Sequence, residues 1–239
     1  MLAGMAIHLR PKAPYARDVL LPGDPGRALA LAQQLLTEPK MSNHHRGLWG
    51  YSGETEAGIP LSIQSTGMGA PSAAIVLREL AELGVRRAIR VGTCGALDGE
   101  LELGQVLCAD AALAEDGVSR SLAAGRLARP DPELHARLAT AAPEAAIVAT
   151  TDLFYETPAA ETDGSARQRW LAAGARAVEM EAAALFGLGP RLGIATACVL
   201  AVSDVFPGGE RRRIDDRALA AAVERMGSAA AAAFDQAQA

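Results

Sequence analysis

The segment LSIQSTGMGAPSAAIVLRELAELGVRRAIRV, residues 61–91, indicates the class of fold. It opens with a short apolar run at residues 61–64, which predicts a strand, and continues into residues 66–69, which predict a turn. Residues 72–83 predict a helix because their apolar side chains recur at helical spacing. The next strand is predicted at residues 87–91. A strand, a helix and another strand in this order are typical of α/β proteins with parallel strands.

The same alternation continues on both sides of this segment. Further strands are predicted at residues 18–21, 105–112, 146–149 and 194–202, and further helices at residues 27–36, 181–192 and 217–236. No repeat of fixed period and no clear linker divides the chain. We therefore expect a single α/β domain over residues 1–239, with a central, mixed and largely parallel β-sheet flanked by helices.

The composition is that of a folded protein and argues against several classes of function. Of the 239 residues, 50% are hydrophobic and 21% are charged, which is too apolar for a disordered chain. The formal net charge of −5 argues against a nucleic-acid binder, which usually needs a basic face. The longest apolar runs have about half of the roughly 20 residues that span a membrane.

The cellular compartment is suggested by the cysteines and by the beginning of the sequence. The three cysteines have no CxxC spacing, which is typical of reduced thiols in the cytoplasm. Pro11 and Pro14 interrupt the region where a signal peptide would have its apolar run. We therefore expect a cytoplasmic protein that is neither secreted nor inserted in a membrane.

Glycine-bearing turns follow three of the predicted strands, at residues 22–27, 66–72 and 90–96. In open α/β sheets, ligands bind at the carboxyl ends of the strands. Glycine allows the backbone to approach an anion closely and to present its N–H groups. The alternative is that these glycines serve only tight turns, but three such turns in one chain favour a binding site.

Arginines stand beside these turns. Arg27 follows the first turn, Arg90 begins the third, and Thr93 adds a hydroxyl group. Arg46 lies in the polar segment at residues 43–47. Guanidinium groups and turn amides together can bind phosphate without a metal, although arginines that only pair with surface carboxylates are the alternative. The absence of GxxxxGK[ST] and GxGxxG argues against a nucleoside triphosphate or a dinucleotide.

Two carboxylates, Glu179 and Glu181, lie close together at the start of a predicted helix. One interpretation is compensation of the helix dipole, because negative charge is favoured in the first turn. The other is a group that holds the hydroxyls of a sugar, because one carboxylate can accept two hydrogen bonds.

Asp204 comes directly after the predicted buried strand at residues 194–202, with only Ser203 between them. A carboxylate at this end of a strand stands where ligands bind, and partial burial would allow it to act as a general acid. The alternative is an N-cap, which the following Pro207-Gly208-Gly209 makes less favourable. The candidates for a charge partner are Arg211, Arg212, Arg213 and Arg217.

Other polar and aromatic residues give weaker signals. Cys94 is interpreted as a packed free thiol rather than a nucleophile, because no base for it is identifiable. Phe154 and Tyr155 are either core residues or a platform that stacks a flat base. His44 and His45 have no zinc-binding spacing, so no metal site is expected.

Taken together, seven segments resemble the nucleoside phosphorylase family, which includes hexameric bacterial purine nucleoside phosphorylases and uridine phosphorylases. In chain order they are LPGDPGR at 21–27, HRG at 45–47, STGMGAPS at 65–72, RVGTCGA at 90–96, DLFY at 152–155, VEMEAA at 178–183 and VSD at 202–204. They cover nearly the whole chain, and their shared order makes the resemblance specific.

The resemblance implies reversible phosphorolysis of a nucleoside, with inorganic phosphate as a substrate and no metal or organic cofactor. It implies that phosphate is bound by Gly23, Arg27, Arg90 and Thr93, and by Arg46 of the neighbouring subunit. It implies that the nucleoside is bound by Met68, Phe154, Glu179, Met180 and Glu181, and by His8 of the neighbouring subunit. The implied assembly is a homohexamer built as a trimer of dimers.

The resemblance favours purine nucleosides, and hence a salvage function. The purine enzymes are similar to this chain in having an aspartate at the position of Asp204, which would protonate N7 of the leaving base with Arg217 as its expected partner. Uridine phosphorylases have a Gly-x-Gln-x-Arg segment that residues 156–177 lack, and a glutamate where this chain has Gly47. A uridine phosphorylase is the alternative within the family. A non-catalytic nucleoside-binding protein is the alternative from another class.

Overall fold

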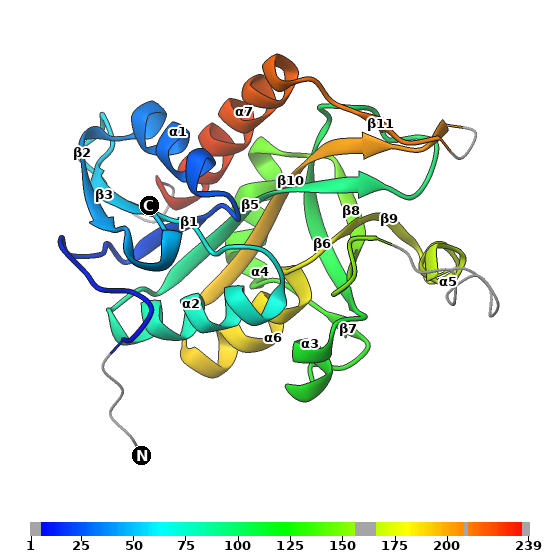
Figure 1. The fold of residues 1–239 in the computed structure, drawn as a ribbon, viewed down its shortest axis with the longest axis horizontal. Coiled ribbons are helices and arrows are strands. Elements are labelled where there is room, and N and C mark those ends of the chain that lie inside the picture. Colours follow the sequence, from blue (N-terminus) through cyan, green and yellow to red (C-terminus); the bar gives the residue numbers. More distant parts are fainter. Residues whose placement is uncertain (1–5, 156–165, 208–209, 236–239) are drawn as a thin grey trace.

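A computed structural model describes residues 6–155, 166–207 and 210–235, which form an α/β structure (Figure 1). The strands are β1 (Asp18–Leu21), β2 (Thr37–Asn43), β3 (Gly50–Glu54), β4 (Pro60–Gln64), β5 (Arg87–Ala96), β6 (Val106–Ala114), β7 (Leu127–Ala128), β8 (Ala145–Thr150), β9 (Ala175–Glu179), β10 (Ala195–Val205) and β11 (Arg212–Arg213). The helices are α1 (Pro25–Leu35), the 3-10 helix η1 (His45–Gly47), α2 (Ala70–Glu82), α3 (Gly117–Ser121), α4 (Pro132–Ala141), α5 (Ala166–Ala172), α6 (Ala182–Leu192) and α7 (Asp216–Asp235).

The strands form one mixed sheet in the order β11-β10-β6-β8-β9-β5-β1-β4-β3-β2, with β7 beside β6. Parallel pairings join β4, β1, β5 and β10 into one block, and β6, β8 and β9 into another. Antiparallel pairings add β2, β3 and β11 at the edges. The expected α/β fold with a mixed sheet flanked by helices is therefore confirmed.

Part of the sheet closes on itself. The two parallel blocks meet twice, through the antiparallel pairs β10–β6 and β5–β9. Because β10 also pairs with β5, the strands β5, β10, β6, β8 and β9 form a ring. The long strands β5 and β10 run side by side in this ring, with Asp204 in register with Gly95 near their carboxyl ends.

Helices bury both faces of the sheet, with α1 and α7 above it and α2 and α6 below it in Figure 1. The apolar cluster beneath α1, α4 and α7 includes Leu20, Leu31, Ile89, Met226 and Phe234. The cluster beneath α2 and α6 includes Leu21, Val76, Leu77, Leu80 and Leu185. Side chains of alternating strand positions thus pack on opposite helix layers, as expected for a sheet covered on both sides. No helix in the described part of the chain is long and apolar enough to cross a membrane.

The first glycine-bearing turn ends in a well-capped helix. Asp24 is the N-cap of α1, and its side chain accepts a 2.7 Å hydrogen bond from the backbone N–H of Arg27. Pro25 occupies the first turn, where its missing N–H costs nothing. The cap therefore fixes Arg27 directly after the carboxyl end of β1.

The third glycine-bearing segment differs from its prediction. Residues 92–95 were expected to form a turn, but β5 continues through them to Ala96 because they pair with β10 and β9. Gly92 is required for close packing rather than for a turn. A Cβ atom at Gly92 would lie 2.7 Å from Cζ of Arg90 and 2.9 Å from a side-chain carbon of Leu200.

Candidate active site

A cavity of about 730 Å³ lies at the carboxyl ends of β1, β5, β9 and β10. This volume is typical of a small-molecule site. The predicted residues that line it are Gly23, Arg27, Met68, Arg90, Thr93, Phe154, Glu179, Met180, Glu181 and Asp204. His8, Arg46 and Arg217 do not line this cavity. Strand ends far apart in the sequence are therefore brought together as the sheet topology predicts.

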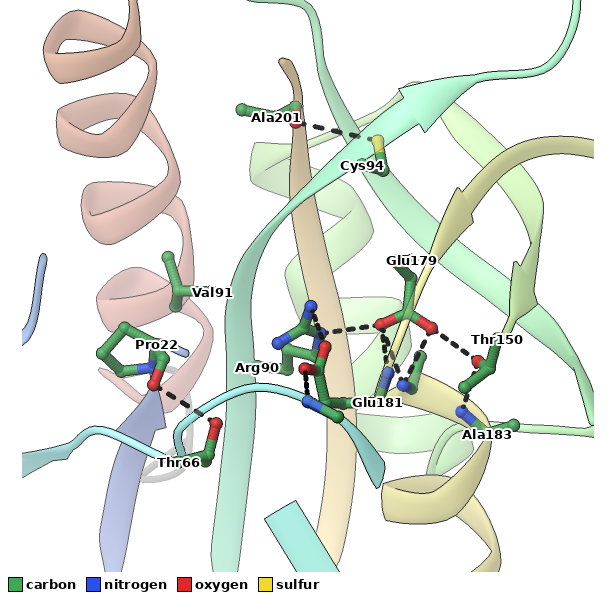
Figure 2. A network of polar contacts seen from close by, with 12 residues as sticks. Pro22, Thr66, Arg90, Val91, Cys94, Thr150, Glu179, Glu181, Ala183 and Ala201 are labelled. Carbon is green, nitrogen blue, oxygen red and sulfur yellow. Dashed lines mark hydrogen bonds and ion pairs between the residues drawn. The ribbon is translucent and has the colours of Figure 1, made fainter. Parts of the chain in front are cut away.

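Arg90 is buried between the two carboxylates (Figure 2). Its Nε atom donates to Oε2 of Glu179 at 2.9 Å, and its Nη2 atom lies 2.5 Å from Oε2 of Glu181. Burial disfavours the charged form of Arg90, but the attraction of Glu181 and Glu179 outweighs it and raises the Arg90 pKa. The guanidinium therefore stays charged and fixed in a buried position.

Glu179 is satisfied by the chain itself. Its oxygens accept hydrogen bonds from the backbone N–H groups of Glu181 and Ala182, and from the Thr150 hydroxyl at 2.5 Å, besides the one from Arg90. Burial raises the Glu179 pKa, and the charge of Arg90 opposes this increase. Glu179 was predicted as a nucleoside ligand and lines the cavity, and these bonds also allow it to position Arg90 and the start of α6.

Glu181 has fewer partners in the chain. Its Oε1 atom accepts a 2.5 Å hydrogen bond from the backbone N–H of Gly69, and its Oε2 atom pairs with Arg90. Gly69 has a φ of +88°, which a residue with a side chain rarely adopts. A carboxylate has about four acceptor positions, so Glu181 keeps capacity for hydroxyl groups of a ligand.

Arg27 brings a second positive charge to this end of the cavity. Burial, and next the positive charge of Arg90, lower the Arg27 pKa, while Asp24 and Glu181 act in the opposite direction. Two guanidinium groups that repel each other favour an anion bound beside them. Thr66 ties the adjoining turns together, because its backbone N–H donates to Pro22 O at 2.9 Å.

Asp204 lies at another part of the cavity and is paired with a different arginine from the one expected. Nε of Arg211 donates to Oδ1 of Asp204 at 2.7 Å, and Nη1 of Arg213 is 3.5 Å from the same oxygen. The Ser203 hydroxyl donates to Oδ2 at 2.6 Å. Arg217 was predicted as the partner, but it is exposed on α7, away from the cavity lining.

The reason for this correction is a hairpin. The strand β11 pairs antiparallel with β10, with Asp204 in register with Arg213. This antiparallel pairing places the arginines at residues 211–213 beside Asp204, before α7 begins. Pro207-Gly208-Gly209 between an apolar strand and the arginines is the sequence signal that could have predicted this hairpin.

The aromatic pair and the cysteine each fit one of their two interpretations. Phe154 and Tyr155 are 55% and 76% exposed, so neither is a core residue. Both line the cavity, and Cζ of Arg211 lies 5.1 Å from the ring centroid of Phe154.

Cys94 is buried, and its thiol lies 3.7 Å from Ala201 O. Burial raises the Cys94 pKa, which agrees with a packed thiol and not with a nucleophile.

His8 and Arg46 both lie outside this cavity, and His8 contacts His45, the residue before Arg46. Nδ1 of His8 is 2.7 Å from Oε1 of Glu79, and the backbone O of His8 is 3.2 Å from Nδ1 of His45. Arg46 is exposed, with a left-handed φ of 59°. Glu79 also accepts hydrogen bonds from the backbone N–H groups of residues 7–9, so these residues are anchored to α2.

Some lining residues were not predicted. Sequence reasoning missed Leu97, Arg167, Trp170 and Phe206 as parts of the cavity wall. Arg167 and Trp170 belong to α5, a helix too short to give a clear periodic signal. Within the described residues, no cluster of histidine, cysteine, aspartate and glutamate side chains is arranged to hold a metal ion.

The sequence was compared with protein families and with known proteins. A family model described as the phosphorylase superfamily matches residues 17–237. A relative from Geobacillus kaustophilus (strain HTA426), named purine nucleoside phosphorylase DeoD-type, is 36% identical over 226 residues, which cover 89% of this chain and 92% of the relative.

Two further relatives carry the same name. The protein of Caldanaerobacter subterraneus subsp. tengcongensis is 34% identical, with 89% of this chain and 94% of the relative covered. The protein of Alkaliphilus metalliredigens (strain QYMF) is also 34% identical, with 89% of this chain and 93% of the relative covered. The match of the family model and these identities show that the chain belongs to the phosphorylase superfamily.

Proposed function

We propose that the protein is a purine nucleoside phosphorylase that reversibly converts a purine nucleoside and inorganic phosphate into the free base and a pentose 1-phosphate. The observation that carries the proposal is the joint presence, in one cavity, of two arginines, the carboxylate of Glu181 and the Asp204–Arg211 pair. The relatives named purine nucleoside phosphorylase support the same activity.

Phosphate would bind at the end that holds Arg27 and Arg90, beside Gly23 and Thr93. The two guanidinium groups orient the dianion and relieve their mutual repulsion by binding it. Holding a nucleophile in line with the anomeric carbon lowers the barrier by several kcal/mol, up to roughly 7–11 in favourable models. Phosphate is thus a substrate, and the proposal includes no metal and no organic cofactor.

The carboxylates would act on the nucleoside. Cleavage of the N-glycosidic bond builds oxocarbenium character on the sugar, which the adjacent phosphate dianion stabilises. Glu181 would hold the sugar hydroxyls, and Met68, Met180 and Phe154 would pack against the ligand. Asp204 in its protonated form, positioned by Arg211, would donate its proton to N7 of the leaving purine and become a carboxylate paired with Arg211.

We infer further that the active protein is a cytoplasmic homo-oligomer, such as a hexamer formed as a trimer of dimers. The supporting observation is that His8, which contacts His45, and Arg46, the next residue after His45, both lie outside the cavity of their own chain. If they complete a neighbour's cavity, mixing inactive Arg46→Ala and Asp204→Asn chains during refolding restores part of the activity, because some cavities receive neither substitution. No recovery, or an active monomer by light scattering, contradicts the shared site.

The deciding experiment measures base release from inosine, guanosine, adenosine and uridine, with and without phosphate. We expect phosphate-dependent release from purine nucleosides and little release from uridine. Preferred cleavage of uridine points to a uridine phosphorylase. Release without phosphate points to hydrolysis, and binding of nucleosides without any release points to a non-catalytic nucleoside-binding protein.

A further inference from the structure

Thr150 is a fully buried residue at the end of β8 that does not itself line the cavity. Its hydroxyl donates a 2.5 Å hydrogen bond to Oε1 of Glu179 and accepts a 3.0 Å hydrogen bond from the backbone N–H of Ala183 (Figure 2). The parallel pairing of β8 with β9 places Thr150 in register with Glu179. The hydroxyl group is thus used once as a donor and once as an acceptor, both times within the active-site framework.

Thr150 and Arg90 contact different oxygens of the same carboxylate. Oε1 of Glu179 accepts from the Thr150 hydroxyl and from the backbone N–H of Ala182, whereas Oε2 accepts from Nε of Arg90 at 2.9 Å. A carboxylate is planar, so a hydrogen bond at one oxygen also constrains the direction of the other. Rotation of this carboxylate away from Thr150 would therefore disturb its contact with Arg90.

Arg90 is the group through which this constraint reaches the cavity. Its Nε atom is held by Glu179, and its Nη2 atom pairs with Glu181. A guanidinium has five N–H donors, so two carboxylates can fix its orientation and still leave donors for an anion. Arg90 lines the cavity, whereas Thr150 lies behind it.

We propose that Thr150 is a positioning residue for phosphate, because its hydroxyl holds Glu179 in the orientation that directs the Arg90 guanidinium toward the anion. This inference rests on the proposed nucleoside phosphorylase function, in which Arg90 binds phosphate. The alternative is that the hydroxyl only accepts from Ala183 and so stabilises the start of α6. The two roles differ in what they predict for the KM for phosphate.

The charge of Glu179 depends on the same hydrogen bond. The titratable groups that act on Glu179 are Arg90 and Cys94 of β5, Cys198 of β10, and Glu181. Burial raises the Glu179 pKa, the charge of Arg90 lowers it, the charge of Glu181 raises it, and the hydrogen bond from Thr150 lowers it. Both thiols stay neutral, because burial raises their pKa. Without the hydroxyl, Glu179 takes up a proton at higher pH and then no longer balances the charge of Arg90.

The first test measures the KM for phosphate, and kcat at saturating phosphate, in Thr150→Val, which replaces the hydroxyl by a methyl group. We expect the KM to rise about 10-fold, as for the loss of a hydrogen bond to a charged group, and kcat to stay near the parent value. Thr150→Ser keeps the hydroxyl and should restore the parent KM. Thr196→Val is the matched control, because Thr196 is a buried strand residue that donates to Leu185 O at 3.4 Å and does not line the cavity.

A role in packing alone predicts the opposite order, because Thr150→Val preserves the shape of the side chain better than Thr150→Ser. A phosphate KM that is unchanged in Thr150→Val, or raised more in Thr150→Ser, overturns the proposal. As pH falls, the phosphate KM of Thr150→Val should begin to rise at a higher pH than that of Thr150→Ser, and coincident profiles contradict the proposal. If Thr150→Val does not fold, Thr150→Ala removes the same hydroxyl and carries the same expectations.

A second measurement does not depend on turnover. Isothermal titration calorimetry gives the affinity of inorganic phosphate for the protein without nucleoside. We expect Thr150→Val to bind phosphate about 10-fold more weakly than the parent protein, and Thr150→Ser and Thr196→Val to bind it with parent affinity. Equal affinities of Thr150→Val and a parent protein that releases base contradict the role of Thr150 and leave the proposed function intact. Weaker binding by Thr150→Val, in a protein that releases no base, contradicts the proposed function and leaves the role of Thr150 intact.

Discussion

Arg90 of β5 and Glu181, directly before α6, form a buried ion pair in which Nη2 and Oε2 are 2.5 Å apart (Figure 2). The pair joins the group proposed to bind phosphate to the group proposed to bind the sugar. Because both side chains are almost fully buried, neither can move independently. In the proposed function, this contact would set the distance between phosphate and the nucleoside before either binds, which is a form of preorganisation.

Replacing Arg90 by alanine is expected to raise the KM for phosphate sharply. It also leaves Glu179 and Glu181 buried without their cation, so we expect the free energy of unfolding to fall by about 3–5 kcal/mol. Phosphate-dependent base release and urea unfolding measure the two effects. Arg78→Ala is the control, because its exposed ion pair with Glu82 should contribute about 1 kcal/mol or less. An unchanged phosphate dependence in Arg90→Ala would reject the role of Arg90.

Gly92→Ala tests the position of Arg90 without removing it. The added methyl group would meet Cζ and Nη2 of Arg90 at 2.7 Å, so the guanidinium must shift. We expect a higher KM for phosphate and a smaller change in nucleoside binding, measured by initial rates at varied phosphate. Gly99→Ala is the matched control, because its methyl group would meet no atom within 4 Å. Equal kinetics for the two variants would show that Arg90 tolerates displacement.

The sequence was sufficient to predict most of the sheet and the place of the cavity. Apolar runs identified β1, β4, β5, β6, β8 and β10, because strands buried on both faces need such runs. The rule that ligands bind at the carboxyl ends of strands then brought Arg27, Arg90 and Asp204 to one region. The strands β2 and β9 were not predicted, because their residues alternate or are polar and their pairing depends on distant neighbours.

The partners within the cavity could not be predicted from sequence patterns. The four arginines after Asp204 look equivalent in the sequence, and only the register of β10 with β11 selects Arg211 and Arg213. In the same way, the sequence around Glu179 does not indicate that its oxygens accept hydrogen bonds from Arg90, Thr150 and the start of α6. Nor does it indicate that Glu181 has fewer such partners. These contacts depend on strand register and on packing between residues far apart in the sequence. Local propensities for helix and strand therefore do not predict them.

The three cysteines are expected to be unreactive in the folded protein. All are buried, and burial raises the pKa of Cys94, Cys108 and Cys198, in the case of Cys108 to about 12. Because the thiolate is the nucleophile, alkylation by iodoacetamide at pH 8 should be slow until urea is added, as measured by mass spectrometry. Rapid labelling of the native protein at Cys94, with loss of activity, would restore the alternative of a nucleophilic thiol.

Because of the same buried thiols, we expect the free energy of unfolding to fall at alkaline pH. Unfolded cysteines release their protons near pH 8.5, whereas the buried thiols keep theirs to higher pH. Above pH 8.5 the unfolded state therefore binds fewer protons than the native state, and the free energy of unfolding falls as pH rises. The expected slope is at most about 1.4 kcal/mol per pH unit for each thiol. Urea unfolding at pH 8 and pH 10 measures it, and a constant midpoint would contradict the prediction.

Asp204→Asn is expected to lower purine turnover by about 10²–10⁴-fold, because the proton donor is lost in the transition state. Nucleoside binding should change much less, because the substitution preserves the shape of the side chain. Single-turnover rates and equilibrium binding separate these two quantities. Equal turnover in the variant and the parent protein would remove Asp204 from the proposed catalytic role.

The partner of Asp204 is tested by a pair of matched substitutions. Arg211→Met removes the 2.7 Å hydrogen bond to Asp204 and the stacking on Phe154, so turnover should fall, with a shifted pH profile. Arg217→Met removes an exposed side chain at the start of α7 and should leave the rate and the pH profile near the parent values. Both variants lose one positive charge, so a difference in turnover between them depends on the position of the replaced arginine. Loss of turnover in Arg217→Met but not in Arg211→Met would show that the hairpin rearranges when substrate binds.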